Sequence, residues 1–174
     1  MVVSQLAAIL DSLNRERVKY VVVGGVAVLL HGIKRFTDDL DLVIGLDPAN
    51  VNSAIDTLLK HGLLPRVPCD PHEFADPIAR RKWIDDKGMV VFAWNHPTLH
   101  GFVVDVFVDH PFPFEEMLAN SIEGTLGNVK TRIASLDHLL AMKRHANRAK
   151  DQEDVRRLEQ IKQYGALDLS LIHI

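Results

Sequence analysis

One segment near the N-terminus limits the possible folds more than any other part of the chain. Residues 21–45 read VVVGGVAVLLHGIKRFTDDLDLVIG. The apolar, β-branched run Tyr20–Val23 predicts a buried strand that ends at two glycines, and Leu40–Ile44 predicts a second strand. Between them, Val26–His31 predicts a short helix. Buried strands that alternate with helices require helices packed on a sheet, so we expect an α/β (α+β) fold.

The rest of the sequence continues this alternation. Pro65–Pro77 is rich in Pro, Asp and His and is predicted to be mostly loop. Apolar spacing and turn residues predict further elements: helices at 6–13 and 51–59, an antiparallel pair of strands at 89–94 and 102–108, one more strand at 128–133, a helix capped by Ser135 and a final helix from about Ala149.

The length of 174 residues allows one domain, or one domain with a helical extension. We expect a core with a small mixed β-sheet flanked by helices over residues 1–130, and a short C-terminal helical segment over residues 131–168 packed on that core. The last six residues, LSLIHI, do not continue the preceding pattern. They resemble the translation of a sequencing-library adaptor, so residues 169–174 are predicted to be a non-native tail, with a short terminal strand as the alternative.

The composition excludes several classes of protein. Hydrophobic residues make up 47% and charged residues 25% of the chain, which is typical of a soluble globular protein. No apolar run is long enough to cross a membrane, and no basic segment followed by an apolar core marks a signal peptide. The single cysteine, Cys69, cannot form an internal disulfide. These features predict a cytoplasmic protein without membrane contacts.

Three aspartates are the first candidates for a functional site. Asp39 and Asp41 alternate with Leu40 in the second predicted strand, so they share one face roughly 7 Å apart. Asp105 interrupts an otherwise apolar strand, where an unpaired carboxylate is costly unless the strand lies at an edge and shows it to water. Like charges this close repel unless a cation lies between them, and Mg²⁺ prefers carboxylate oxygens. A solvent-facing strand with two acids is the alternative for Asp39 and Asp41.

The paired glycines favour a bound phosphate. Gly24 and Gly25 end one predicted strand and begin a helix. Glycine lets the backbone approach a ligand closely, and the free N–H groups of a helix start attract phosphate. The alternative is a tight turn with no ligand.

These elements together resemble a known superfamily. The pattern consists of two glycines, an R-x-T-x-D-x-D motif and a later strand with one aspartate, at Gly24, Gly25, Arg35, Thr37, Asp39, Asp41 and Asp105. In this order, over roughly residues 18–109, it resembles the DNA polymerase beta-type minimal nucleotidyltransferase superfamily. The Gly-Gly variant is similar to the toxin-like AbiEii and MenT branch and to small antibiotic nucleotidyltransferases; Gly25 stands where the superfamily more often has serine, so a hydroxyl contact to phosphate is absent there.

The resemblance implies a nucleotidyltransferase fold and a magnesium-dependent reaction. Asp39, Asp41 and Asp105 would hold two Mg²⁺ ions, which bind the triphosphate of ATP or another nucleoside triphosphate and the hydroxyl of an acceptor. The glycine pair would contact the phosphates, and Arg35 and Thr37 would also belong to the nucleotide site.

The C-terminal segment strengthens the likeness to the AbiEii-like branch. Lys143, Arg148, Asp151 and Asp154 lie in a K-x-x-x-x-R-x-K-D-x-x-D pattern. By resemblance, Lys143 is a catalytic residue that neutralises phosphate, and Arg148 and Asp151 contribute to nucleotide binding. The alternative is an ion-pair network that joins two helices, and both roles are compatible.

The acceptor is less constrained. Lys130–Lys162 carries nine Lys or Arg against five Asp or Glu, although the whole chain has a net charge of −3. A basic segment favours a polyanion, so the acceptor is predicted to be RNA, with the 3′ end of tRNA first, in a toxin–antitoxin system that could include a cognate antitoxin protein. The alternatives are an aminoglycoside, lincosamide or protein acceptor, or a catalytically silent antitoxin or binding partner. All three aspartates are present, which argues against a silent protein.

Overall fold

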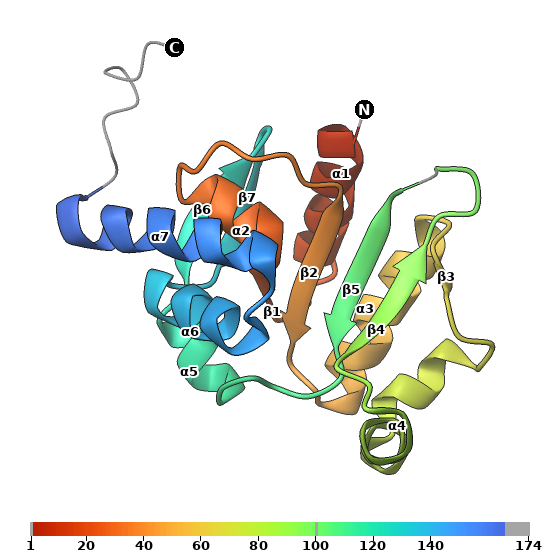
Figure 1. Ribbon diagram of the computed structural model, residues 1–174. Coiled ribbons are helices and arrows are strands. Elements are labelled where there is room, and N and C mark those ends of the chain that lie inside the picture. Colours follow the sequence, from red (N-terminus) through yellow and green to blue (C-terminus); the bar gives the residue numbers. More distant parts are fainter. Residues whose placement is uncertain (1, 100, 166–174) are drawn as a thin grey trace.

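The computed structural model describes residues 2–99 and 101–165, which form a mixed β-sheet with helices packed on it (Figure 1). The sheet order is β3-β4-β5-β2-β1-β7-β6. The strands are β1 (Tyr20–Val23), β2 (Asp39–Ile44), β3 (Leu64–Pro65), β4 (Val91–Asn95), β5 (Val103–Phe107), β6 (Ile122–Leu126) and β7 (Val129–Ile133). The helices are α1 (Val2–Arg15), α2 (Gly24–Leu30), α3 (Pro48–Lys60), the 3₁₀ helix η1 (Pro71–Ala75), α4 (Pro77–Lys87), α5 (Phe114–Ala119), α6 (Leu136–Ala146) and α7 (Ala149–Tyr164).

The centre of the sheet is made by β1, β2 and β5. Strand β2 pairs antiparallel with β1 on one side and parallel with β5 on the other. The predicted hairpin is confirmed, because β4 pairs antiparallel with β5. Strand β7 pairs parallel with β1, and β6 pairs antiparallel with β7. The predicted α/β class with a mixed sheet is therefore confirmed.

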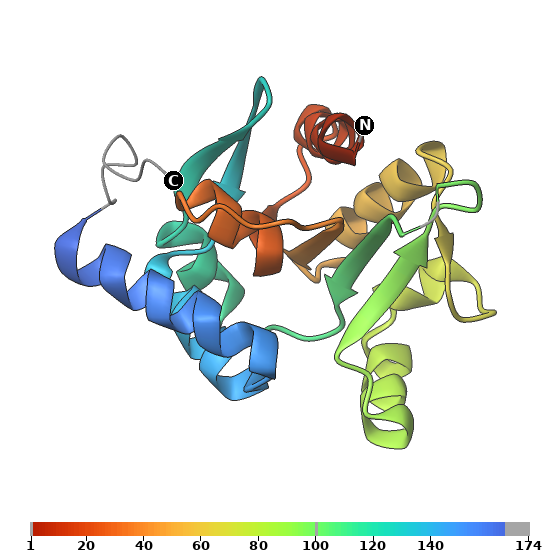
Figure 2. The same cartoon turned by 45° about the horizontal axis from the view of Figure 1, so that its top comes forward.

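The two faces of the sheet are covered unevenly. Leu40, Leu42 and Ile44 on β2 are at most 1% exposed, as the alternation predicted. On that face, Ile44 lines a small apolar space together with side chains of α3 and η1. Figure 1 shows α3 behind β4 and β5, with no helix in front of these two strands in that view. Helices α6 and α7 lie together at the other end of the sheet in both views (Figure 2).

Several elements differ from the prediction. The stretch Pro65–Pro77 is not simply a loop, because Pro65 ends β3 and η1 follows Asp70, whose side chain accepts a hydrogen bond from the backbone of His72. Helices α4 and α5 and strand β6 were not predicted. Helix α4 has no clear apolar period, because only Arg80 and Trp83 are buried in it. Strand β6 also lacks one, because it is an edge strand held by local pairing with β7.

The predicted boundary between the core and the helical segment can be compared with the elements of the structure. The boundary after residue 130 lies inside β7, which belongs to the same sheet as β1; the helical segment begins with α6 at Leu136. Residues 169–174 lie outside the described residues. Within residues 2–99 and 101–165, no helix is both long and apolar enough to cross a membrane.

Candidate active site

Three carboxylates come together on the central strands. Asp41 on β2 is the direct partner of Asp105 on β5, and Asp39 lies two residues before Asp41 on the same face. On the other side of β2, Asp41 is the partner of Val23, the last residue of β1. Strand β5 is not an edge, because it lies between β4 and β2. The edge-strand alternative for Asp105 is therefore excluded.

The electrostatics of these carboxylates are unfavourable without a cation. Burial raises the pKa of Asp41 to about 6, and the negative charges of Asp105 and Asp39 act in the same direction. Burial also raises the pKa of Asp105, with a further contribution from Asp39. The Oδ1 atom of Asp105 is buried and has no hydrogen-bond partner in the described part of the chain. Such an oxygen lacks the partner that a buried polar atom normally has.

These observations fit a magnesium site that needs further ligands. Carboxylate oxygens suit Mg²⁺, and a cation between them would relieve the repulsion that raises the pKa of Asp41. Among residues 2–99 and 101–165, no group of three or more His, Cys, Asp or Glu side chains forms a ready metal site. Because Mg²⁺ commonly takes one or two carboxylates together with water and substrate phosphates, the remaining ligands would come from the nucleotide and from water.

The glycine turn packs directly against Asp41. Gly24 has φ +61°, a conformation that favours glycine, and a Cβ atom there would lie 1.9 Å from Oδ2 of Asp41. The backbone N–H of Gly25 donates a hydrogen bond to the Asp41 carboxylate, which lowers its pKa against the effect of burial. The two glycines are the first residues of α2. Because both contact Asp41, they set the position of this central carboxylate.

Replacing Gly24 by alanine tests this close approach. The new methyl group would displace the Asp41 carboxylate, and the left-handed backbone would cost about 1–2 kcal/mol for any residue with a Cβ. We expect a fall in the free energy of unfolding of this size and a loss of activity of about 100-fold, the cost of a displacement of about 1 Å. Urea unfolding and initial rates would measure both. Gly88→Ala is the control, because Gly88 is also left-handed but has open space at its Cβ position. Equal activity in the two variants would contradict the proposed role of Gly24.

Thr37 and Arg35 lie against the second glycine. A Cβ atom at Gly25 would be 2.5 Å from Oγ1 of Thr37 and 3.5 Å from Cζ of Arg35. The Thr37 hydroxyl donates a weak hydrogen bond, 3.4 Å long, to the backbone oxygen of Asp39. The hydroxyl of Thr37 thus fills the space that a side chain at position 25 would take.

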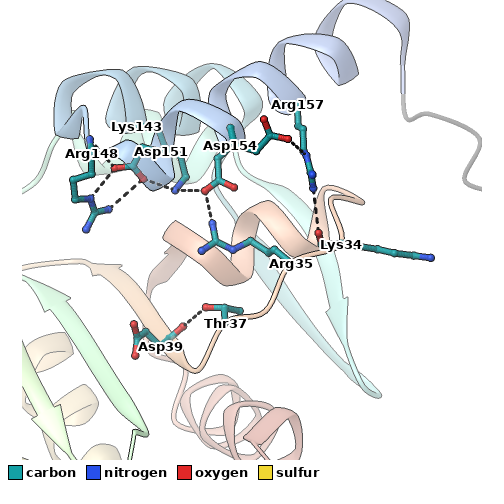
Figure 3. A network of polar contacts seen from close by, with 10 residues as sticks. Lys34, Arg35, Thr37, Asp39, Lys143, Arg148, Asp151, Asp154 and Arg157 are labelled. Carbon is teal, nitrogen blue, oxygen red and sulfur yellow. Dashed lines mark hydrogen bonds and ion pairs between the residues drawn. The ribbon is translucent and has the colours of Figure 1, made fainter. Parts of the chain in front are cut away.

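A buried ion-pair network covers this part of the site (Figure 3). Lys143 on α6 lies 3.0 Å from Oδ1 of Asp151 and 2.7 Å from Oδ2 of Asp154, both on α7. Arg148, at the start of α7, forms an ion pair with Asp151 at 2.7 Å. Arg35, in the loop after α2, forms an ion pair with Asp154. The network therefore joins the C-terminal helices to the segment that leads into β2.

The network stabilises the ionised form of Asp151. Burial acts to raise the pKa of Asp151, but hydrogen bonds from Arg148 and Lys143 outweigh it and hold the pKa at about 2. Lys143 is also close enough to Asp41 to lower the pKa of that carboxylate. Lys143 and Arg148 are therefore close enough to Asp41 to interact with its charge, and together with Asp151 they form the structural network that was the alternative.

The basic character of the C-terminal segment is largely neutralised. Seven of its nine basic residues are ion-paired within the described part of the chain: Lys130, Lys143, Arg144, Arg148, Arg156, Arg157 and Lys162. The partners lie mostly on α6 and α7. This segment offers less free positive charge than its composition suggested.

A nucleotidyltransferase is expected to have a glycine turn and carboxylates on a mixed sheet, as this chain does. The protein family that the sequence matches belongs to the same class. Residues 1–173 match the family described as "Nucleotidyltransferase of unknown function (DUF6036)". The chain belongs to this family and is a nucleotidyltransferase enzyme. No curated protein matches the sequence.

Solved structures show the same fold. The lincosamide antibiotic adenylyltransferase LnuA, solved with lincomycin, is 17% identical to this chain, with a TM-score of 0.61. The match covers 91% of this chain and 96% of that chain. ANT(2")-Ia, solved with adenylyl-2"-tobramycin, is 15% identical, with a TM-score of 0.61 and coverage of 97% and 92%. An antigenic nucleotidyltransferase-like protein from Paracoccidioides brasiliensis is 19% identical, with a TM-score of 0.56 and coverage of 92% and 74%. The closeness to AbiEii and MenT proteins stays a prediction.

One residue near the site was not found from the sequence. Arg66 lowers the pKa of Asp105 through its charge, although 39 positions separate them in the sequence. It directly follows β3, which lies within the stretch predicted as loop. A signal existed only in the apolar pair Leu63-Leu64 before Pro65, which is too short to predict a strand.

Proposed function

We propose that this protein transfers a nucleoside monophosphate from a nucleoside triphosphate to a hydroxyl-bearing acceptor and releases pyrophosphate, with Mg²⁺ as cofactor. The observation that carries this proposal is the pairing of Asp41 with Asp105 on adjacent strands, with Asp39 on the same face. The raised pKa of Asp41 and the buried, unpartnered oxygen of Asp105 support it, because a cation bound between the carboxylates would offset both.

Each carboxylate has a role in this reaction. Asp39 and Asp41 would hold one Mg²⁺ ion, and Asp41 and Asp105 the other. The ions would supply neutralisation of the triphosphate charge and a lowered pKa of the acceptor hydroxyl. The acceptor oxygen forms a bond to the α-phosphorus while the bond to pyrophosphate breaks. Asp105, which is only half-buried as a side chain, would accept the hydroxyl proton. Phosphoryl chemistry of this kind depends mainly on positioning and charge.

Thr37 should act on the nucleotide rather than on the fold. Its hydroxyl lies against the glycine turn, where it can donate to a phosphate oxygen. We expect Thr37→Val, which keeps the shape of the side chain, to raise the KM for the triphosphate about 5- to 10-fold for one lost hydrogen bond, with little change in melting temperature. Steady-state kinetics with varied triphosphate would show this. Thr125→Val, at an exposed position on β6, is the control, and an unchanged KM in the Thr37 variant would contradict the role.

The acceptor we propose first is RNA, with the 3′ end of tRNA as the site of modification in a toxin–antitoxin system. The excess of basic residues in Lys130–Lys162, of which Lys143 and Arg148 interact with Asp41, supports it, since phosphate contacts are electrostatic. A small hydroxylated acceptor is the second candidate. Two observations favour it: most of those basic residues are already paired with acids, and the fold matches proteins solved with lincomycin and adenylyl-tobramycin over nearly their whole length.

One experiment separates these possibilities. Purified protein would receive total tRNA, an aminoglycoside and lincosamide panel, or cell lysate, each with labelled triphosphates and Mg²⁺. Label on RNA with release of pyrophosphate is the expected result. Label that enters only antibiotics, or only a protein band, would contradict the RNA acceptor and leave nucleotidyl transfer standing. Absence of pyrophosphate with every acceptor would favour a silent binding partner.

A further inference from the structure

Arg66 lies on the side of Asp105 that is away from the glycine turn. We propose that Arg66 binds an anionic group, a phosphate or carboxylate, on the acceptor, close to the hydroxyl that reacts. This inference rests on the proposed nucleotidyl transfer and adds the chemical class of the acceptor, which would be an anion rather than a polycation.

The register of the sheet places Arg66 in the same row as the carboxylates. The Arg66 backbone N–H donates to the Ala93 oxygen at 2.9 Å, directly after the paired residues of β3 and β4. Ala93 is the partner of Asp105, and Asp105 is the partner of Asp41. Directly opposed residues on neighbouring strands point to the same face. The row across the sheet is therefore Arg66, Ala93, Asp105, Asp41.

The row also shows which substrate Arg66 can reach. Beyond Asp41 the row continues to Val23, which is followed by the glycine turn at Gly24. The glycine turn and Arg66 thus lie on opposite sides of the carboxylates. If the triphosphate occupies the glycine side, then Arg66 faces the acceptor. Neighbouring strands are about 4.8 Å apart, so the Cα atoms of Arg66 and Asp105 are separated by roughly 10 Å, which suits a small acceptor or a polymer end.

Only a small side chain separates Arg66 from Asp105 in this row. Ala93 contributes only a methyl group to this row. Burial along β4 and β5 alternates: side chains on the far face are buried, whereas those on the face of the row, Val91, Ala93, Val103, Asp105 and Phe107, are only half-buried. No helix lies in front of these strands in Figure 1. A ligand could therefore lie on this face beside Asp105.

Arg66 is available for a ligand, unlike the other arginines near the site. Arg35 and Arg148 are bound to Asp154 and Asp151. Arg66 is exposed and, within the described residues, forms no ion pair. Its planar guanidinium can bind a phosphate or carboxylate with two hydrogen bonds, which makes arginine well suited to such groups.

The test compares the wild type with Arg66→Gln and with Arg81→Gln as a matched control. Arg81 is exposed on α4 and paired with Asp85 on the same helix, so its replacement changes the net charge equally. The probes are the trinucleotide CpCpA and ribose 5-phosphate, each bound in the presence of Mg²⁺ and a non-hydrolysable ATP analogue. We expect Arg66→Gln to weaken at least one probe about tenfold or more and to leave the ATP analogue unaffected. For CpCpA, the slope of log K against log salt should fall by about 0.7.

The outcomes distinguish RNA from a small phosphorylated acceptor as the source of the anion. They also distinguish the proposed role of Arg66 from the proposed nucleotidyl transfer. A loss with CpCpA alone points to RNA, and a loss with ribose 5-phosphate alone points to a small phosphorylated acceptor. Binding of both probes within twofold of wild type, no binding of either probe by the wild type, or an equal loss in Arg81→Gln would overturn the role of Arg66. Weaker probe binding in Arg66→Gln together with no pyrophosphate release by the wild type would instead contradict the proposed transfer while supporting the anion site.

Discussion

Replacing Asp41 by asparagine should abolish most nucleotidyl transfer and stabilise the metal-free protein at the same time. Asp41 is shared between the two proposed metal positions, so its loss should lower turnover by roughly 100- to 1,000-fold or more, the range seen when a charge-stabilising group is removed. Asparagine keeps the shape and can still accept the hydrogen bond from Gly25. The repulsion from Asp105 and Asp39 disappears, so the fold should lose nothing.

The sign of the stability change follows from the raised pKa. An acid with a folded pKa of about 6, against an ordinary value of 3.8, is destabilising when ionised. Its cost is absent below about pH 4, grows as the pH rises to about 6, and is then complete at on the order of 2–3 kcal/mol. The melting temperature of Asp41→Asn in EDTA should therefore exceed that of the wild type by a margin that widens from pH 4 to pH 7.

Two controls make this prediction specific. Asp39 is exposed, so Asp39→Asn should lose activity with little gain in stability. Asp86→Asn, on the exposed part of α4, should change neither property. Near wild-type turnover of Asp41→Asn with Mg²⁺ would place the active site elsewhere, and a margin in melting temperature that is independent of pH would contradict the electrostatic explanation.

The local part of this site could be predicted from the sequence, because strand alternation is a property of consecutive residues. Leu40 and Leu42 are buried, and Asp39 and Asp41 share the opposite face, as their spacing requires. The pairing of Lys143 with the aspartates of α7 also followed from spacing, since these residues belong to consecutive helices.

The remaining contacts depend on tertiary structure. Which strand lies beside β2 is set by packing, and no local pattern indicates that Asp105 faces Asp41. Arg35 and Asp154 are 119 residues apart, and their contact exists only because α7 packs over the loop after α2. Arg66 is aligned with Asp105 through a strand of two residues, too short for any periodic signal.

Lys143→Met should destabilise the fold more than Gly24→Ala or either aspartate replacement on β2. The change keeps most of the aliphatic stem of the side chain and removes the charge that lies between Asp151 and Asp154. Breaking a buried ion pair from one side costs roughly 3–5 kcal/mol, because the remaining charge stays buried. Arg148 and Arg35 still contact the two acids, so we expect about 3 kcal/mol, which corresponds to a fall in melting temperature of roughly 6–12 °C.

A double-mutant cycle separates the structural role of Lys143 from a catalytic one. Lys143→Met combined with Asp154→Asn should recover part of the lost stability, because one acid and one base are then removed together. Lys150→Met, at an exposed position on α7, should leave stability unchanged. If Lys143 acts mainly on phosphate, then Lys143→Met would instead keep its melting temperature and raise the KM for the triphosphate. A large loss of stability with normal kinetics in the folded fraction would assign Lys143 to the network that holds α7 against the carboxylates.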